Sequence, residues 1–563
     1  MQKTTYLLLI IYVLFSSEGF CQNLTLKIKG ETEVESRTID SLRYIKMHND
    51  YTSIKTEVDS IQNKLYKLGY IECQTKHITK INDSSFLAQF KLNHKFNTIY
   101  VYYKEDDIDI SELKNVSNEV TKDYFKLNFQ EVENALNYLN SKISGQGFPF
   151  SKLQLSNIKI KSDTSLDAEL EVIISQKKRI INDIVIKGYE KFPKAYLKHF
   201  LKIKPLQVFD LATVKNKTEQ LANLNFAKQL KPPEVLFSKD STVLYLYIEK
   251  TTSNAFDGFL GFGTNEDTNK LEFDGYLNLN LTNNLHFGES LQLLYKSDEN
   301  DQKTFEAHAT LPYLFKSPIG VDVALRIFKK DSSFTTTNQM AKLHYQINAK
   351  HKVYGGITST ESNYLRSTTS STIQDYNTNL FNIGHLYTNT QPYHLLFPIK
   401  SKFFIETGIG KRKTDFGTEK QVQLNLDAFN IFNLNNKNAI YLRTKGSYLI
   451  SDSYYENELF RFGGINSIRG FEENSLFASL FSFINSEYRF QLSNSIYIHS
   501  IFDAGYFENK ITDTQQKLFG YGFGFGILTN AGLFKLNYAN GKTEDSNFKL
   551  SNSKVHLSLT ANF

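Results

Sequence analysis

One arginine and one aspartate toward the C-terminal end of the chain have the types and spacing for paired charge chemistry. Arg469 lies in segment 462–471, FGGINSIRGF, between glycines and aromatic residues, and Asp503 follows it in segment 502–505, FDAG. An arginine on a folded-back loop that meets an inward-facing aspartate forms a charge-assisted, bidentate ion pair. An ordinary solvated loop is the alternative reading, and the sequence leaves both open.

Catalytic chemistry has no matching pattern in the chain. We find no G-x-S-x-G elbow, no H-E-x-x-H motif and no phosphate-binding P-loop. The glycines at 520, 522, 524 and 526 recur with a period of two, which places them on one face of a strand rather than in a phosphate loop. We therefore predict a protein that is not an enzyme, with no cofactor and with no catalytic or metal-binding residues.

The elements that must position Arg469 and Asp503 are strands. Residues 254–563 contain sixteen candidate segments of about ten residues that alternate apolar and polar side chains, the signature of an outer-membrane barrel. The clearest is Lys554–Phe563, KVHLSLTANF. A soluble sandwich also alternates, but it does not usually place large aromatics on one face of strand after strand. By this alternation Asp503 faces the lumen, and Arg469 lies in the longest connection, 452–479.

Composition agrees with extended structure. Phe and Tyr number 45 and 33, Trp is absent, and none of the 9 prolines follows Pro398. Aromatic residues favour strands, and proline interrupts their hydrogen-bond ladders. We predict a sixteen-stranded antiparallel transmembrane β-barrel over 254–563.

Residues 1–21 have the features of a secretory signal peptide. Lys3 supplies the positive charge, Tyr6–Phe15 the apolar stretch, and Gly19 and Cys21 the small residues before a cleavage site. Lipidation of Cys21 is the alternative, which Glu18 three residues earlier disfavours. After cleavage Cys73 would be the one remaining cysteine, so no internal disulfide is expected. No later stretch of 18 apolar residues occurs, so any membrane span must be a closed barrel.

The N-terminal half repeats one pattern three times, over 22–94, 95–178 and 179–253. Each unit contains a strand, two helices and two further strands. Three weak copies of one pattern are stronger evidence than any single copy. The formal net charge of +6 is diffuse and lacks a basic run with interleaved aromatics. Nucleic acid is therefore not an expected partner.

The combination of repeats and barrel resembles the BamA/TamA superfamily of outer-membrane assembly factors, which carry POTRA repeats before a surface-antigen barrel. The tetrad Ile468-Arg469-Gly470-Phe471 is similar to the (V/I)-R-G-(F/Y) motif of loop six in that family. Asp503 and Gly505, in segment 502–505, FDAG, resemble its Asp-x-Gly motif on strand thirteen. Glu487 matches an acidic position on strand twelve. Segment 312–315, PYLF, also looks familial, and Phe563 resembles the terminal aromatic of barrel targeting signals. With three repeats the outline is closer to TamA than to BamA.

The resemblance implies α+β POTRA repeats (1 to 3, in the three ranges above) in the periplasm and a sixteen-stranded barrel in the bacterial outer membrane. It implies that Arg469 anchors loop six through Asp503, with Glu487 nearby and Phe471 packed under the loop. The partners it implies are the outer-membrane lipid bilayer, unfolded outer-membrane protein clients, and periplasmic or inner-membrane accessory proteins.

The function that the resemblance implies is assembly or translocation of client proteins through a seam between the first and last barrel strands. Three glycines, at 258, 261 and 263, would weaken the first of these strands, although simple packing explains them equally well. Two alternatives remain. One is a dedicated secretion pore of the two-partner type, whose members usually have two repeats and a plug helix that we do not find between Gln22 and the first strand. The other is a passive porin-like channel.

Overall fold

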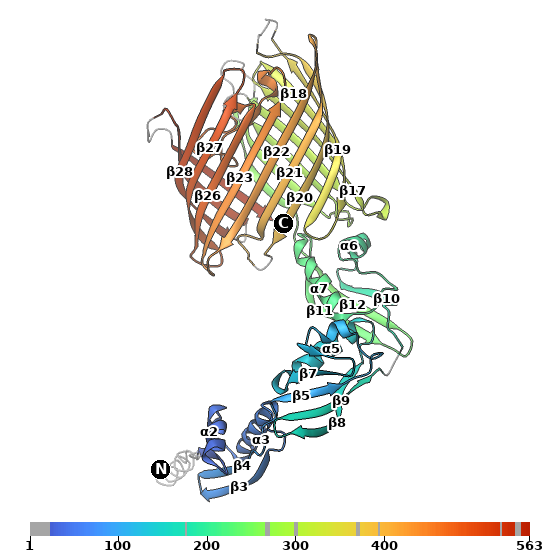
Figure 1. Cartoon of the computed structure of the whole chain (residues 1–563). Coiled ribbons are helices and arrows are strands. Elements are labelled where there is room, and N and C mark those ends of the chain that lie inside the picture. The colour runs from blue at the N-terminus through green and yellow to red at the C-terminus, as the bar shows by residue number, and fades with distance from the viewer. Residues whose placement is uncertain are drawn as a thin grey trace, which may run out of the picture. The chain divides into compact units, whose positions relative to one another are not determined.

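The computed structural model describes residues 23–174, 177–264, 271–297, 302–366, 372–391, 394–529, 532–546 and 553–562. The signal peptide predicted over 1–21 and the terminal Phe563 lie outside these residues. The chain divides into two compact units (Figure 1). The first unit is Met1–Arg179 with Val208–Leu211, and the second is Ile180–Gln207 with Ala212–Phe563.

The first unit begins with a four-stranded sheet that carries two helices. Its strands lie in the order β2-β1-β4-β3, with β1 and β4 parallel. The helix α3 presents an apolar stripe, including Ile54, Val58 and Ile61, to the buried core. The elements are β1 (Leu24–Gly30), α2 (Glu33–Ser41), β2 (Met47–His48), α3 (Tyr51–Lys67), β3 (Gln74–Asn82) and β4 (Ser85–Lys91).

The second repeat has one hairpin more than the sequence pattern predicts. Its sheet has five strands in the order β6-β7-β5-β9-β8. The additional pair, β6 and β7, was missed because both strands are short and β7 is stabilised by tertiary pairing with β5. The elements are β5 (Thr98–Tyr102), α4 (Ile110–Leu113), β6 (Glu119–Val120), β7 (Tyr124–Asn128), η1 (Phe129–Glu131), α5 (Val132–Gly145), β8 (Lys152–Ser162) and β9 (Ser165–Ile173).

The third repeat is the predicted strand, helix, helix, strand, strand unit. Its sheet has the order β10-β12-β11, with β10 parallel to β12. The elements are β10 (Asp183–Gly188), α6 (Lys194–His199), α7 (Leu211–Glu219), η2 (Gln220–Asn223), β11 (Ala227–Phe237) and β12 (Thr242–Lys250).

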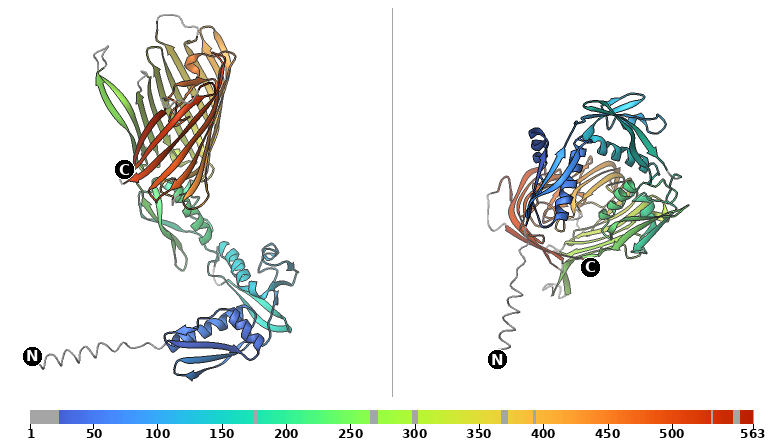
Figure 2. Two further views of the ribbon diagram at one scale, coloured as in Figure 1. Left: turned by 90° about the vertical axis from the view of Figure 1, so that its left-hand side faces the viewer. Right: turned by 90° about the horizontal axis from the view of Figure 1, so that it is seen from below.

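Sixteen antiparallel strands then form a barrel in chain order, and the last strand pairs with the first to close it (Figures 1 and 2). The predicted fold class, α+β POTRA-like repeats followed by an all-β barrel, is confirmed. The barrel strands are β13 (Ala255–Thr264), β14 (Leu271–Thr282), β15 (Ser290–Ser297), β16 (Gln302–Leu311), β17 (Ile319–Lys330), β18 (Phe334–Gln346), β19 (His351–Tyr364), β20 (Tyr376–Thr390), β21 (Ile399–Thr414), β22 (Gly417–Asn433), β23 (Asn438–Ile450), β26 (Leu480–Gln491), β27 (Ile496–Asn509), β28 (Thr514–Thr529), β29 (Gly532–Thr543) and β30 (Ser553–Asn562).

Strand β27 illustrates how alternation builds the barrel wall. Ile498, Phe502 and Tyr506 are exposed on the outside, whereas Asp503 is fully buried on the inside. Apolar side chains predominate on the outward face, as in membrane barrels, whereas the inward face carries Asp503 together with the buried Ile501 and Phe507. In the described part of the chain, no helix has the length and apolar character needed to cross a membrane.

Candidate functional site

The connection between β23 and β26, residues 451–479 and here called loop six, folds into the barrel. It contains the helical turn η4 (Glu456–Glu458) and the hairpin β24 (Phe460–Phe462) and β25 (Leu476–Ala478), which the sequence pattern did not predict. The turn between β14 and β15 contacts the third repeat, where the Tyr196 hydroxyl donates to the Gly288 carbonyl at 3.2 Å. Because successive strands are antiparallel, loop six leaves the barrel at the opposite end.

Arg469 of loop six lies in the lumen against two acidic side chains of the wall. Its guanidinium donates to Asp503 through Nε at 2.9 Å and Nη2 at 2.6 Å, and its backbone N–H donates to the same carboxylate at 2.9 Å. The remaining nitrogen, Nη1, bonds to Glu487. The structure therefore brings together the arginine, aspartate and glutamate that the sequence singled out.

A second arginine balances the charge of this cluster. The other oxygen of Glu487 accepts from Arg489 Nε at 2.8 Å, which leaves two cations facing two anions. Arg469, Glu487 and Asp503 are each more than nine-tenths buried. A buried pair of this kind adds little net stability over apolar packing, but removal of one partner costs about 3–5 kcal/mol, because a charge is left without compensation. The cluster therefore holds loop six strongly in one position.

Close backbone contacts fix the rest of the tetrad. Gly470 has φ +90°, and a Cβ there would overlap the backbone nitrogen of Gly541 on β29. A Cβ at Gly520 of β28 would overlap the Arg469 carbonyl oxygen. Glycine is thus required for loop and wall to approach this closely.

The two apolar residues of the tetrad pack beside these contacts. Ile468 is fully buried in a cluster that includes Phe481 and Phe483, and Phe471 packs against the edge of that cluster. Gly505 leaves room for Ile468, since a Cβ there would lie 3.2 Å from the Ile468 Cδ1 atom. Each of the predicted loop and lumenal residues thus lies at one junction between loop and wall.

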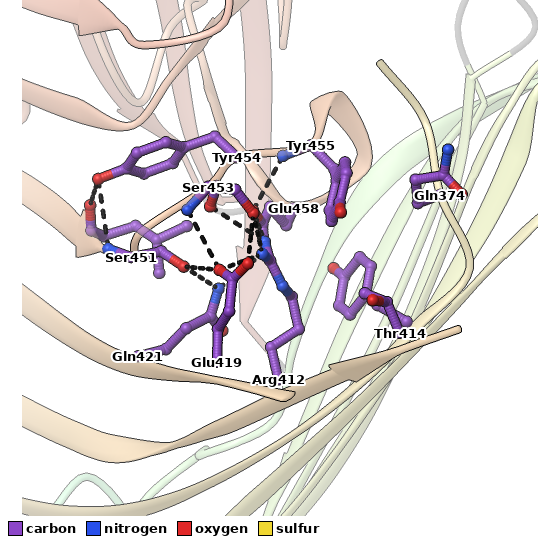
Figure 3. A network of polar contacts seen from close by, with 12 residues as sticks. Gln374, Arg412, Thr414, Glu419, Gln421, Ser451, Ser453, Tyr454, Tyr455 and Glu458 are labelled. Atoms are coloured by element: carbon purple, nitrogen blue, oxygen red, sulfur yellow. Dashed lines mark hydrogen bonds and ion pairs between the residues drawn. The ribbon is translucent and has the colours of Figure 1, made fainter. Parts of the chain in front are cut away.

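A second junction holds the beginning of loop six, and sequence reasoning missed it (Figure 3). Arg412 of β21 is only 1% exposed and reaches from the wall into the loop. It bonds to Glu458, to Glu419 at 2.6 Å and to the Ser453 hydroxyl at 2.6 Å. Gln421 donates to the other oxygen of Glu458 at 2.9 Å. Here the cation belongs to the wall and the acid to the loop, the reverse of the arrangement at Arg469.

Neighbouring loop residues extend this second junction around the lumen. Glu456 accepts from Lys330 of β17 at 2.7 Å, and Asn457 donates to the Ser362 hydroxyl of β19 at 2.8 Å. The available sequence signal was the pair Arg412 and Glu419, which face each other across the tight β21–β22 turn. No motif marks Glu458, since its contact depends on how the loop folds back.

After the tetrad, two consecutive glutamates of loop six reach toward the place where the barrel closes. Glu472 lies 2.8 Å from Lys554 Nζ on the last strand, β30. Glu473 lies 3.2 Å from Lys296 Nζ on β15. The first and second barrel strands, β13 and β14, lie between β30 and β15 in the barrel order. Loop six therefore has an ion pair on either side of the closing strands.

The closing contact itself is short. Among the residues that the structure describes, β13 pairs with β30 at three positions, Ala255↔Asn562, Phe256↔Ala561 and Asp257↔Thr560. On its other side β13 pairs with β14 along its whole length, from Ala255 to Thr264. In the left view of Figure 2, the green β13–β14 hairpin diverges from the red last strands beyond this contact.

The described residues contain no cluster of three or more His, Cys, Asp or Glu side chains that could hold a metal ion.

Known proteins match both parts of the chain. The Omp85 superfamily domain model matches residues 260–559, and the model of the surface antigen variable number repeat, the POTRA repeat, matches residues 180–250. No curated protein sequence matches the chain.

Among solved structures, CdiB from Acinetobacter baumannii is 15% identical with a TM-score of 0.53, over 80% of this chain and 86% of that one. CdiB from Escherichia coli is 13% identical with a TM-score of 0.52, over 91% and 98%. BamA from Haemophilus ducreyi lacking POTRA domains 1–3 is 13% identical, over 82% and 99%, with a TM-score of 0.49. At 13–15% identity, the two CdiB structures show that this chain has the same fold.

The family model covers more than half of the chain and coincides with the closed barrel, while the repeat model coincides with the third α+β unit. The chain therefore belongs to the Omp85 superfamily, a family of outer-membrane β-barrels that insert or translocate proteins.

Proposed function

We propose that this protein is an outer-membrane assembly factor that receives unfolded client proteins on periplasmic POTRA repeats and inserts them through the seam between β13 and β30. The observation that carries the proposal is the three-residue pairing of these two strands. A strand that lacks a full partner presents free backbone N–H and C=O groups, which pair readily with another extended chain.

The short seam lowers the barrier to opening. Each backbone hydrogen bond contributes about 0.5–1.5 kcal/mol net, so three residue pairs contribute a few kcal/mol at most. An incoming client strand replaces these hydrogen bonds as it forms, so that opening requires no external energy source. The surrounding lipid favours pairing with the client strand, because an unpaired backbone N–H or C=O group has no water there to bond to.

The ion pairs of loop six bear directly on seam opening. Arg469 fixes the loop to the wall strands on the β30 side, and Glu472 pairs with β30 itself. Glu473 pairs with Lys296 on the other side of the closing strands. Parting of β13 from β30 separates Glu473 from Lys296 but leaves Glu472 with Lys554. We assign the Glu473–Lys296 ion pair the role of stabilising the closed seam.

A disulfide across the seam tests the proposal. Phe256→Cys and Ala561→Cys, combined with Cys73→Ala, place two cysteines at facing positions of β13 and β30. Oxidation should abolish client insertion, and reduction should restore it. Leu536→Cys with Leu557→Cys is the matched control, since it locks β29 to β30, a pair that stays together during opening. Full activity of the oxidised seam variant contradicts the proposal.

Depletion of the protein followed by quantitation of the outer-membrane proteome separates the remaining readings. A broad loss of barrel proteins supports a general assembly factor. Loss of one exported protein supports a dedicated secretion pore. An unchanged proteome, with solute conductance by the purified barrel, supports a passive channel.

A further inference from the structure

The turn between β16 and β17 has an unusual backbone for its sequence. In segment 312–318, Tyr313, Phe315 and Lys316 have φ of +55°, +52° and +61°, a left-handed region that bulky side chains rarely adopt. None of the three is glycine. A conformation of this kind persists only where the surrounding structure holds it, which points to a role for the side chains that it orients.

Tyr313 points into the third repeat. Its ring is buried and packs edge-on against Tyr196 of α6, with ring centroids 4.8 Å apart, and His199 stacks on it at 5.4 Å. His199 Nε2 also lies 3.0 Å from the Lys316 carbonyl, which accepts its hydrogen. The buried Tyr196 hydroxyl donates to the Gly288 carbonyl of the adjacent turn at 3.2 Å. One side of the turn is thereby fixed to the repeat.

Phe315, two residues later, has the opposite surroundings. It is 92% exposed, more than any other large apolar side chain in the described residues. Leu311 and Ile319, at the adjoining ends of β16 and β17, are exposed beside it. Leu343 and Tyr345 of the paired strand β18 continue this surface and are also exposed. Phe315 therefore extends the outward apolar face of the barrel wall beyond the strand ends.

The neighbouring turn between β14 and β15 repeats the arrangement. Its inner side meets the third repeat, where Asn283 donates to the Tyr189 hydroxyl at 2.9 Å. Glu289 accepts from the backbone N–H groups of Leu285 at 2.6 Å and Phe287 at 3.1 Å. Leu285 and Phe287 are left 66% and 68% exposed. The two turns thus contact the third repeat on one side. On the other side they expose three large apolar side chains, Leu285, Phe287 and Phe315.

We infer that Phe315, Leu285 and Phe287 insert into the leaflet of the bilayer on the side of the third repeat. The two turns then join that repeat to the membrane as well as to the barrel. The occupant is lipid because the exposed surface is continuous with the outward apolar face of the strands, which lipid covers in a membrane barrel. Aromatic side chains favour this interfacial depth, and Lys316 beside Phe315 suits the phosphates of the headgroups.

The chain has no tryptophan, so that a single substitution supplies a clean fluorescence probe. Phe315→Trp in the full-length protein, reconstituted into phosphatidylcholine vesicles, should show blue-shifted emission. Phospholipids brominated near the headgroup should quench it, and aqueous iodide should not. Phe523→Trp, on the outer face of β28, is the positive control, and Ile81→Trp, at an exposed position of β3 in the first repeat, is the aqueous control. No client is present, so quenching by bromine reports lipid contact alone.

Emission of the Phe315→Trp variant that matches the aqueous control and is quenched by iodide would overturn the inference. Blue-shifted emission without quenching by brominated lipid would overturn it as well, since it means burial in protein. Retention of the heat-modifiable barrel on gels shows that each variant is folded, and Phe287→Trp provides an independent second probe. The outcome does not depend on whether the seam opens, so it can fail while the proposed function holds.

Discussion

Asp503 accepts three hydrogen bonds from Arg469, two from the guanidinium and one from the backbone N–H. A wall carboxylate thereby fixes both the side chain and the main chain of loop six at a single residue. Because the loop also reaches Arg412 and Lys296, its position couples distant strands of the barrel to the seam.

Arg469→Ala should destabilise the barrel by about 3–5 kcal/mol, because Asp503 loses its charge partner while it stays buried. The measurement is urea-induced loss of the heat-modifiable form on gels, together with client insertion. Arg326→Ala is the control: its ion pair with Glu306 is exposed and should contribute less than about 1 kcal/mol. Wild-type stability and insertion in Arg469→Ala would remove the anchoring role.

Arg412→Ala should release the beginning of loop six from β21 and β22. The buried Glu458 is then left without its cation, so we expect a loss of stability similar to that for Arg469→Ala. Limited trypsin digestion of reconstituted protein should cut after Arg461, whose side chain is largely buried in the intact structure. Arg412→Lys should restore stability and protection from trypsin only in part, because lysine cannot make the forked contacts to Glu458, Glu419 and Ser453. Equal protection of Arg461 in wild type and Arg412→Ala would contradict the second junction.

Glu473→Lys and Lys296→Glu should each favour the open seam, and the double exchange should restore the closed one. The readout is the rate of disulfide formation in the double-cysteine seam variant described above, which falls when β13 and β30 part. Glu472→Lys is the matched control, since its partner Lys554 lies on the same side of the opening. If Glu472→Lys and Glu473→Lys change the rate of disulfide formation equally, the loop acts through the general stability of the barrel. The Glu473–Lys296 ion pair then has no specific role at the seam.

Cys73 of the first repeat should react slowly with thiol reagents. Burial raises the pKa of its thiol from 9.0 to about 11, and Glu35 adds to the effect. Because the folded state disfavours the thiolate, this contribution to stability is fully present below about pH 9. It is lost as the pH rises toward about 11. Unfolding of the first repeat, followed by hydrogen exchange in α3, should therefore need less urea at pH 11 than at pH 9.

Cys73→Ala should reduce that dependence on pH. Rapid labelling of Cys73 by Ellman's reagent at pH 8 in the native protein would contradict the expected burial of the thiol.

Periodicity made the barrel predictable from sequence. Alternation along β27 placed Asp503 inward and Phe502 outward without reference to any other strand, because side chains of a strand alternate between its two faces. The helix α3 was predictable for a similar reason, since its buried residues recur at helical spacing. The tetrad around Arg469 was identified from its residue types and from family resemblance.

Contacts that depend on loop folding were not predictable in this way. Nothing local to Glu458 marks it as the partner of Arg412, and the pairing of Glu473 with Lys296 joins residues far apart in the sequence. The extra strand β7 and the left-handed turn at Tyr313 likewise depend on elements that pack against them. The sequence by itself determined which residues share a face of each strand or helix, because backbone geometry sets that period. Only the tertiary structure decided which loop meets which wall and how far the seam closes, because those contacts form between segments that no local pattern relates.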